Sequence, residues 1–334
     1  MAFELAITSG NKKMIPAVVD GIDVEWSRQG TPGQMTFTVL KDSMLSFNEG
    51  DCATLRVDGY DVFWGYIVKK SRDKEQQIQV TCLDQLFYLA QNQSVCLIEK
   101  ESVWDVMQRC KKEIGLQLGK PSSRSPYKIP KHRIDSATSY LDILQTALDI
   151  TLAYSGEMFV IYDDFGRLTL RHIDEMKTNS KGEALLIDQN NAENFDYETS
   201  IENSYNEITL WQSDGSTAGE GKIFEAAHEK SSANQKKWGR LNYFEILDKD
   251  TSKESAKLKA KQLLELHNQV KRKLSVKGVF SAPFIRGGSS VLVSLTLGDL
   301  VVKQWFMVES VKHHFANDHS TMDMDLRSSK GFVL

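Results

Sequence analysis

The sequence has no apolar run that approaches the roughly 20 residues a membrane-spanning helix needs, so we expect no membrane insertion. Its opening residues, Met1 to Glu4, lack the basic region and apolar core of a secretion signal. We therefore expect a protein that is made and folds in a cytoplasm.

An excess of basic residues is also missing. The formal net charge of the 334 residues is −4, and the short basic run Lys271–Lys273 has acidic residues spread around it. A nucleic-acid-binding surface needs clustered Lys and Arg to displace counterions. We therefore expect no specific nucleic-acid binding.

Cysteine is scarce, and its spacing argues against two common uses. The chain has four cysteines, which are Cys52, Cys82, Cys96 and Cys110. They form no CxxC pair and lack the dense spacing of a disulfide framework. We predict that they are reduced residues that contribute to packing.

The short motifs of the common enzyme classes are absent as well. The sequence contains no GxSxG elbow, no GxxxxGK[ST] loop, no HExxH and no GxGxxG. We predict no catalytic residues, no cofactor-binding residues and no metal ligands. The expected protein is therefore not an enzyme and carries no cofactor.

The chain does contain alternating apolar and polar residues over positions 1–95. Gln77–Cys82 and residues 52–57 both have an apolar residue at every second position, which is typical of strands with one buried face. Asp58-Gly59 separates residues 52–57 from another apolar run, Tyr60–Val68, and this dipeptide is a strong hairpin signal. Residues 24–39 form a second hairpin candidate. Short strands with tight turns predict a small antiparallel barrel or sandwich.

The apolar period changes to that of helices between residues 96 and 155. A stripe of apolar residues runs from Val103 to Ile114, with Ser102 as the expected N-cap and Gly115 as the expected stop. A second helix is predicted between Ser139 and Gly156. The segment 119–131 between them holds three of the six prolines, which indicates an irregular connector. A hairpin over residues 158–172 follows, with its turn at 163–166.

Strands return from about residue 185. One ends near Leu210, residues 213–221 are expected to form a mobile loop, and a helix is predicted over 256–267. The last strands are expected at 291–297, 307–315 and 321–326, with turns at 298–299 and 317–318. The predicted fold class is α+β and mainly β. It comprises a first β domain at residues 1–95, a helical and hairpin insert at 96–184, and a second β domain with one helix at 185–334.

Two groups of residues are the strongest candidates for chemistry. Asp163-Asp164 could act as a carboxylate pair, but Asp is also favoured in hairpin turns, and we prefer the turn. His313 and His314, with His319 across the turn, could hold a metal. Neighbouring side chains of a strand point to opposite faces, so we expect one inward and one outward histidine instead.

Two further pairs are weighed in the same way. Asp323 and Asp325 share one strand face and could bind Ca²⁺, but such a site needs six or more oxygen ligands. An exposed, charged strand face that protects an edge is the preferred interpretation. Trp64 and Tyr66 could stack on a sugar or a base, although packing or a subunit contact is favoured.

Several of these segments together resemble a known family. Asp61–Val68 resembles a strand of phage tail hub proteins, and Glu101–Met107 resembles the start of a helix in their inserted domain. Gly156–Leu170 is similar to the strand, turn and strand of that insert. The closing order Leu297-Gly298-Asp299, Phe306–His314 and Thr321–Leu326 resembles the end of the family pattern. The segment near 213–240 departs from it. The resemblance is to contractile-tail baseplate hub proteins of the XkdQ/YqbQ group.

The resemblance implies a homotrimer in which each subunit supplies two tail-tube-like β-barrels. Such a ring would have pseudo-sixfold symmetry and would adapt a sixfold tail tube to a threefold spike. The implied partners are the tube protein, the spike protein, other baseplate proteins and the tape measure protein. The implied location is the baseplate of a virion or phage-tail-like particle that is assembled in the bacterial cytoplasm.

Two other functions are considered as alternatives. A carbohydrate- or receptor-binding module would need an exposed aromatic groove, for which Trp104, Trp211, Trp238 and Trp305 are available but are not clustered in sequence. A cell-wall hydrolase would need a nucleophile or metal constellation. The hub is preferred over both.

Overall fold

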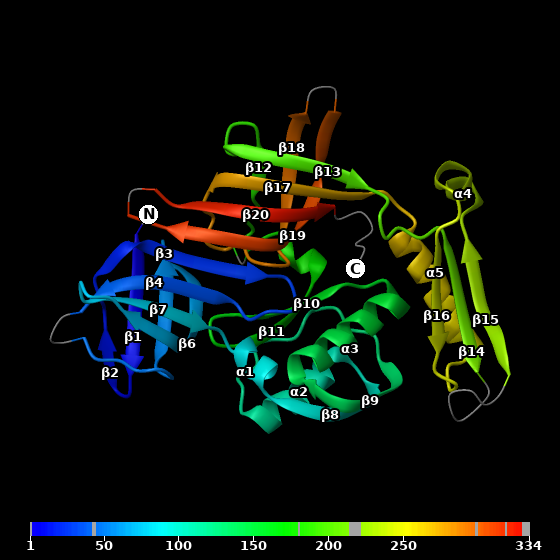
Figure 1. Cartoon of the computed structure of the whole chain (residues 1–334), viewed down its shortest axis with the longest axis horizontal. Coiled ribbons are helices and arrows are strands. Elements are labelled where there is room, and N and C mark those ends of the chain that lie inside the picture. Colours follow the sequence, from blue (N-terminus) through cyan, green and yellow to red (C-terminus); the bar gives the residue numbers. More distant parts are fainter. Residues whose placement is uncertain are drawn as a thin grey trace.

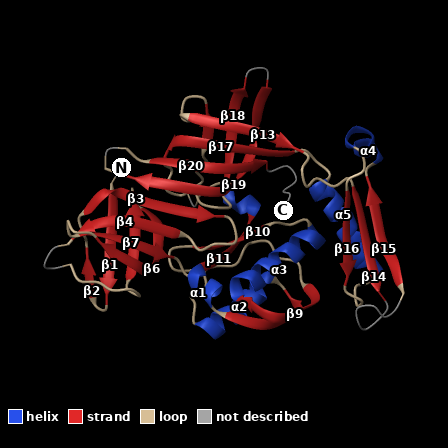
Figure 2. Ribbon diagram, viewed as in Figure 1, coloured by secondary structure: helices blue, strands red, loops and turns tan. Residues whose placement is uncertain are grey.

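The computed structural model describes residues 2–41, 45–179, 181–213, 222–297, 300–317 and 319–328. No helix in these ranges is both long and apolar enough to cross a membrane. The structure has a main sheet, a middle lobe of residues 86–176 below it, and a side lobe of residues 207–267 at one end (Figures 1 and 2).

Most strands of the main sheet come from the two ends of the chain. The N-terminal strands are β1 (Phe3–Ser9), β2 (Lys12–Met14), β3 (Val18–Ser27), β4 (Gln34–Leu40), β5 (Cys52–Val57), β6 (Tyr60–Arg72) and β7 (Gln77–Leu83). The later strands are β12 (Leu186–Asp188), β13 (Asn194–Ser200), β17 (Lys271–Phe280), β18 (Ser290–Leu297), β19 (Leu300–Phe315) and β20 (Thr321–Ser328).

These strands form one continuous sheet in the order β13-β17-β20-β19-β3-β4-β7-β6-β5-β1-β2. β18 pairs with β19, and β12 pairs with β18 in parallel. The N-terminal and C-terminal strands meet where β3 and β19 run antiparallel, from Ile22 opposite Phe315 to Ser27 opposite Ser310. One apolar core extends from Leu5 to Leu326 across both halves.

The prediction of a mainly β, α+β fold with antiparallel strands is therefore confirmed. Within the described ranges the strand order runs from one edge to the other without closing into a barrel in either half. The strand order joins the two predicted β domains directly through β3 and β19. Sequence patterns missed this pairing because nearly the whole chain separates the two strands. The domain boundaries themselves stay a prediction.

The middle lobe has its own core between helices and short strands. Its elements are α1 (Leu86–Gln91), β8 (Gln93–Glu101), α2 (Val103–Ile114), β9 (Ile129–Ser139), α3 (Tyr140–Ser155), β10 (Phe159–Asp163), β11 (Leu168–His172) and the 3₁₀ helix η1 (Ile173–Met176). β8 pairs with β9 and β10 with β11. Leu89, Met107, Leu144 and Leu170 lie in a core that these elements share.

The predicted helix ends in this lobe are confirmed. The Ser102 side chain accepts a hydrogen bond from the Asp105 backbone N–H, and the Asp105 carboxylate accepts one from the Ser102 backbone, which is a capping box. Ser139 caps α3 in the same manner, through the Asp142 backbone N–H. Gly115 ends α2 with a positive φ, which glycine adopts without steric cost.

Sequence analysis missed the sheet formed by β8 and β9. Val95 and Leu97 of β8 are apolar but exposed. Apolar residues therefore do not mark one buried face of this strand, and its sequence shows no clear alternation of apolar and polar residues. The connector 119–131 is irregular up to the start of β9 at Ile129, as predicted. Arg124 anchors it, since its guanidinium lies 2.9 Å from the carboxylates of Glu157 and Asp174.

The side lobe is a three-stranded sheet covered by one helix. It comprises β14 (Glu207–Ser213), β15 (Ile223–Lys230), α4 (Ser232–Trp238), β16 (Asn242–Leu247) and α5 (Lys253–His267), with the strands in the order β15-β14-β16. Ile208 and Leu210 pack against Ala256, Ala260 and Leu263 of α5. The predicted helix α5 is present, whereas β15, α4 and β16 were not predicted. The mobile loop predicted at 213–221 and the turns at 298–299 and 317–318 fall wholly or partly outside the described residues.

A fourth small core joins all three parts of the molecule. Leu152 of α3, Val160 of β10, Leu266 of α5 and Met307 of β19 are buried together there. The helix α3 of the middle lobe thus contacts both the side lobe and the main sheet.

Replacing Phe315 by alanine should destabilise the fold by about 3–5 kcal/mol, because this side chain is fully buried where β19 pairs with β3. Phe280→Ala is the matched control, since its side chain is 65% exposed on β17 and should change little. Urea unfolding of the full chain measures both. Equal stability of the two variants would contradict the assigned burial.

Candidate functional site: a buried polar junction

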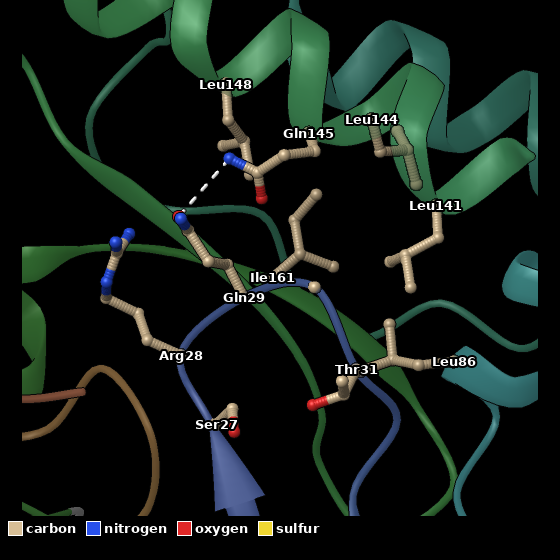
Figure 3. Close-up of a pocket in the computed structure, with 11 residues that line it drawn as sticks. Ser27, Arg28, Gln29, Thr31, Leu86, Leu141, Leu144, Gln145, Leu148 and Ile161 are labelled. Atoms are coloured by element: carbon tan, nitrogen blue, oxygen red, sulfur yellow. Dashed lines mark hydrogen bonds between the residues drawn. The ribbon is translucent and has the colours of Figure 1, made fainter. Parts of the chain in front are cut away.

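The loop after β3 lies against the middle lobe. Figure 3 shows Ser27 to Thr31 facing Leu141, Leu144 and Leu148 of α3, with Ile161 of β10 beside them. The Gln145 side chain donates a hydrogen bond of 3.3 Å to Gln29. The cavity between them has a volume of about 20 Å³, which is room for a single water molecule. This contact surface is packed, and it does not offer a ligand site.

Arg28 connects three elements from this loop. Its side chain is 6% exposed, and its Nε lies 3.0 Å from the Glu309 Oε2. The Arg28 backbone N–H donates to the Glu309 carbonyl at 2.7 Å. Glu309 is the extra residue in a bulge where β19 pairs with β20. Burial raises the pKa of Asp149 on α3, and the charge of Arg28 acts in the opposite direction.

Two buried carboxyl groups lie at the other side of the junction. Asp84 follows β7 and accepts hydrogen bonds of 2.9 Å from the backbone N–H groups of Gly33 and Leu86. Asp163 ends β10 and accepts from the Gln85 side chain at 2.8 Å and the Gly166 N–H at 2.6 Å. Burial raises the pKa of both carboxyls, and the charge of Asp163 raises that of Asp84 further.

Arg286 supplies the positive charge near this pair. Its guanidinium donates to the Asp163 carbonyl at 2.6 Å, and it lies over the rings of Trp26 and Tyr162 at 5.2 and 4.6 Å. The charge of Arg286 lowers the pKa of Asp84 and of Asp163 against the larger effect of burial. A cation between two aromatic faces is well stabilised when desolvated. Arg286 thus connects the C-terminal half to β3 and to the middle lobe.

Gly33 is required where Asp84 approaches the turn after β3. A Cβ at this position would lie 2.5 Å from the Asp84 carboxylate and 2.5 Å from the Trp26 ring. Neither neighbour is free to move, since both are buried. Glycine therefore allows the carboxylate to reach the backbone N–H.

The predicted histidine arrangement is confirmed. His313 is fully buried, while the side chain of His314 is 45% exposed on the opposite face. His319 contacts the Phe280 ring and not the other two histidines. In the part of the chain that the structure describes, no three His, Cys, Asp or Glu side chains are placed to hold a metal ion.

His313 is neutral because it is buried, and its hydrogen-bond partners determine its tautomer. Its Nε2 lies 2.8 Å from the Ile285 carbonyl, so this nitrogen carries the proton and donates. Its Nδ1 accepts from the Ser281 hydroxyl at 2.8 Å. Burial lowers the pKa of His313 to about 4 because the charged form would lose its solvation.

The Asp163-Asp164 pair is a turn, as preferred. Asp163 is buried and Asp164 is exposed. The Asp163 carboxylate caps the turn through Gly166, and the Asp164 N–H donates to the Arg167 carbonyl at 2.8 Å. The two carboxyls do not work together. The charge of Asp163 also raises the pKa of the buried Asp84, an interaction that the sequence did not indicate.

The second aspartate pair lies on the exposed face of β20, as preferred. The expectation that it protects an edge is wrong, because β20 lies between β17 and β19 in the main sheet. Asp325 accepts hydrogen bonds from the hydroxyls of Ser275 and Ser310 at 2.6 and 2.9 Å. Asp323 accepts from the Gly278 N–H at 2.9 Å. Both carboxylates therefore have partners on the neighbouring strands of the main sheet.

The aromatic candidates take part in packing between elements. The Trp64 and Tyr66 rings are 4.9 Å apart, and Tyr66 contacts Tyr88 of α1 at 5.2 Å. Trp64 also covers Gly166 in the β10–β11 turn. These rings connect β6 to the middle lobe, in agreement with the packing interpretation.

Other candidates from the sequence do not gather into one site. The remaining tryptophans Trp104, Trp211, Trp238 and Trp305 lie in α2, β14, α4 and β19. The four cysteines are free thiols, and burial raises the pKa of the Cys52 thiol to about 11. The prediction that the chain has no catalytic, cofactor or metal site remains a prediction.

The junction residues Arg28, Asp84, Arg286 and Glu309 escaped sequence analysis. Each is a single charged residue next to a strand, a turn or a bulge, and none belongs to a catalytic or binding motif. A charged residue within an apolar run, such as Glu309 after Phe306-Met307-Val308, is the signal that could have found part of this site.

The fold gives the class of protein that the chain resembles. A tail protein from Neisseria meningitidis matches with a TM-score of 0.69 at 12% identity, over 99% of this chain and 98% of that chain. An Escherichia coli protein described as a component of the type VI secretion system, with structural similarity to the T4 tail proteins gp27 and gp5, matches with a TM-score of 0.57. It is 10% identical over 97% of this chain and 76% of its own. The chain has the fold of phage tail proteins.

Sequence comparison gives the family. Residues 22–327 match the family described as YQBQ-like, and the chain belongs to this family. The protein XkdQ of the phage-like element PBSX of Bacillus subtilis is 22% identical over 314 residues, which cover 92% of each chain. Together these findings support a structural role in a phage-type tail.

Replacing Arg28 by alanine should lower the free energy of unfolding by about 1.5–3 kcal/mol, the usual worth of a buried hydrogen bond between charged groups. The Glu309 carboxylate loses the guanidinium that lies 3.0 Å from its Oε2 and keeps Arg327, whose Nε lies 3.1 Å from its Oε1. Arg133→Ala is the matched control, because that arginine is 73% exposed beside Asp135 and should cost under about 1 kcal/mol. Urea unfolding compares the two variants, and an equal, small cost would contradict a stabilising role for the ion pair between Arg28 and Glu309.

His313 should make stability depend on pH between about 6.5 and 4. The unfolded chain binds a proton on this residue below its ordinary pKa of 6.5, whereas the folded chain does so only near 4. Its contribution is therefore fully present above pH 6.5 and is lost as the pH falls, by about 2 kcal/mol at pH 5. The raised pKa values of Asp84 and Asp163 have the opposite effect above pH 3.8, because their contribution to stability is lost as the pH rises. The contribution of His313 is therefore measured by comparing the unmodified protein with a variant.

His313→Gln removes the titration and keeps an N–H for the Ile285 carbonyl. The loss of stability between pH 7 and pH 5 should be smaller in this variant than in the unmodified protein. Urea unfolding at the two pH values measures the difference. The same loss in both proteins would contradict the assignment.

Proposed function

We propose that the chain is a structural hub protein in the baseplate of a contractile phage tail or phage-tail-like particle, and that it is not an enzyme. The observation that carries this proposal is that the similarity to tail proteins extends along almost the whole chain. The fold matches a tail protein over 99% of its length, and the sequence matches XkdQ over 92%. The Escherichia coli neighbour, which is described as similar to the T4 tail proteins gp27 and gp5, further supports a place in a phage-type tail.

In this proposal three copies form a ring with pseudo-sixfold symmetry. Residues 1–95 and 185–334 would each have to complete one tube-like barrel within the ring, because their strands form an open sheet in the described chain. Residues 96–184 would decorate the outside. The support is that both halves of the chain contribute antiparallel strands to the main sheet. Two similar units in each of three subunits convert a threefold into a sixfold arrangement. A sixfold tube can then stack on a threefold spike.

The proposed partners follow from that position. They are two further copies of the chain, the tail tube protein, the spike protein, other baseplate proteins and the tape measure protein. The alternatives, a carbohydrate- or receptor-binding module and a cell-wall hydrolase, gain no support from a specific observation. The candidate aromatic residues pack within the chain or lie in separate elements.

Electron cryo-microscopy of purified tail particles tests the proposal. We expect three copies of the chain in a ring between tube and spike, with residues 96–184 on the outside. The reason is the symmetry argument, since three chains with two units each match six tube subunits. Six copies, or a position at a fibre tip, would rule out the adaptor and favour the binding module.

A further inference from the structure

The side lobe exposes a face that its own chain does not cover. Ile208 and Leu210 of β14 point toward α5, so Thr209 and Trp211 point to the other side. On the neighbouring β16, Thr209 is opposite Phe244 and Trp211 is opposite Ile246. We call this side of the β15-β14-β16 sheet the open face. Figure 1 shows the lobe at one end of the molecule, away from the main sheet.

The open face carries large apolar side chains. Phe244 is 56% exposed, and Ile246 and Ile223 are each 60% exposed. The rings of Trp211 and Phe244 lie 6.4 Å apart. Ile223 of β15 is opposite Ser213 on β14 and belongs to the same side as Trp211. Exposed aromatic and aliphatic groups that gather in this way mark interaction surfaces more often than isolated ones do.

β16 is also an unprotected edge. It pairs with β14 on one side and is the last strand in the order β15-β14-β16. Its one charged residue, Glu245, faces α5, where its carboxylate lies 2.5 Å from the Lys259 Nζ. The strand has no proline and pairs with β14 in an uninterrupted register. Its backbone can therefore accept a further strand.

Three other strands at the edges of the described sheets carry exposed charged residues. β15 carries Glu225, Glu229 and Lys230 as exposed residues and has a bulge opposite β14. β13 exposes Asp196 and Glu198. β2 exposes two lysines. Charged residues and bulges are the usual means by which proteins block unwanted pairing at an edge. β16 lacks these means and is apolar on the open face.

The size of the surface indicates its occupant. Three side chains that are a little more than half exposed offer roughly 300 Å² of apolar surface, taking about 150–250 Å² for a fully exposed large side chain. A stable interface between two folded subunits needs about 800 Å² from each. The surface is too small for a second copy of the chain and suits a single strand, whose main-chain hydrogen bonds add affinity.

We propose that β16 binds an extended segment of another tail protein, which adds a strand to the side lobe and places alternate uncharged apolar side chains over Phe244 and Ile246. The proposal rests on a structural role in a tail particle and does not depend on the trimeric ring. β16 (Asn242–Leu247) directly follows the segment near 213–240 that departs from the family pattern. The segment supplies main-chain hydrogen bonds along β16 and apolar contacts on the open face.

Photocrosslinking in assembled particles tests the proposal. Benzoylphenylalanine is placed at position 246, and at position 229 on the opposite edge as the control. We expect the probe at 246 to link to one segment of another tail protein with apolar residues at every second position. The probe at 229 should not link to that segment. A link from 246 to a second copy of this chain, or no product in particles that contain the variant, would overturn the proposal.

The linked segment is then made as a synthetic peptide and titrated against the full-length chain. Ile246→Lys should weaken its binding about tenfold or more, whereas Glu229→Lys should leave it unchanged. Ile246→Thr keeps a β-branched side chain and should give a smaller loss, which provides a test if the lysine variant does not fold. Equal binding by all three variants would overturn the proposal, and it would leave the hub proposal standing.

Discussion

The pairing of β3 with β19 is the constraint on which the rest of the structure depends. It joins Ile22–Ser27 to Ser310–Phe315, so the ends of the chain must meet before the main sheet can exist. The entropy of closing so long a loop grows only slowly with its length, but it must be offset by contacts made at the junction. Phe306 and Phe315, both fully buried, and the single apolar core across the two halves supply those contacts.

The polar junction lies at the end of this pairing, and its position explains its composition. Ser27 and Ser310 are the last paired residues of β3 and β19, and Arg28 and Glu309 follow directly at 3.0 Å. Buried ion pairs add little net stability because desolvation offsets their attraction. They do penalise other arrangements, since a shifted strand would leave the buried Arg28 without its partner. We infer that Arg28, Glu309 and Arg286 mainly fix the register of the strands and the orientation of the middle lobe.

Local features of the fold could be predicted from sequence, and long-range ones could not. The Asp58-Gly59 turn and the Ser102 cap depend on residues within a few positions of each other, and both residues of the turn have the positive φ that such a turn requires. The pairing of β3 with β19 and the approach of Asp84 to Asp163 depend on residues that are far apart. β16 was missed for another reason: the exposed Phe244 and Ile246 hide the alternation that marks a half-buried strand.

The helix α3 shows how these long-range contacts combine. Ile143 and Leu144 lie in the core of the middle lobe, Leu152 packs with Met307 of the main sheet, and Ala153 lies in the core of the side lobe. One rigid helix therefore sets the position of both lobes relative to the sheet. Because close-packed interfaces resist gradual deformation, a force on the side lobe would be transmitted through α3 to the junction at Arg28. A strand bound at β16 would then be held at a fixed position relative to the main sheet, which is what a structural connector in a tail requires.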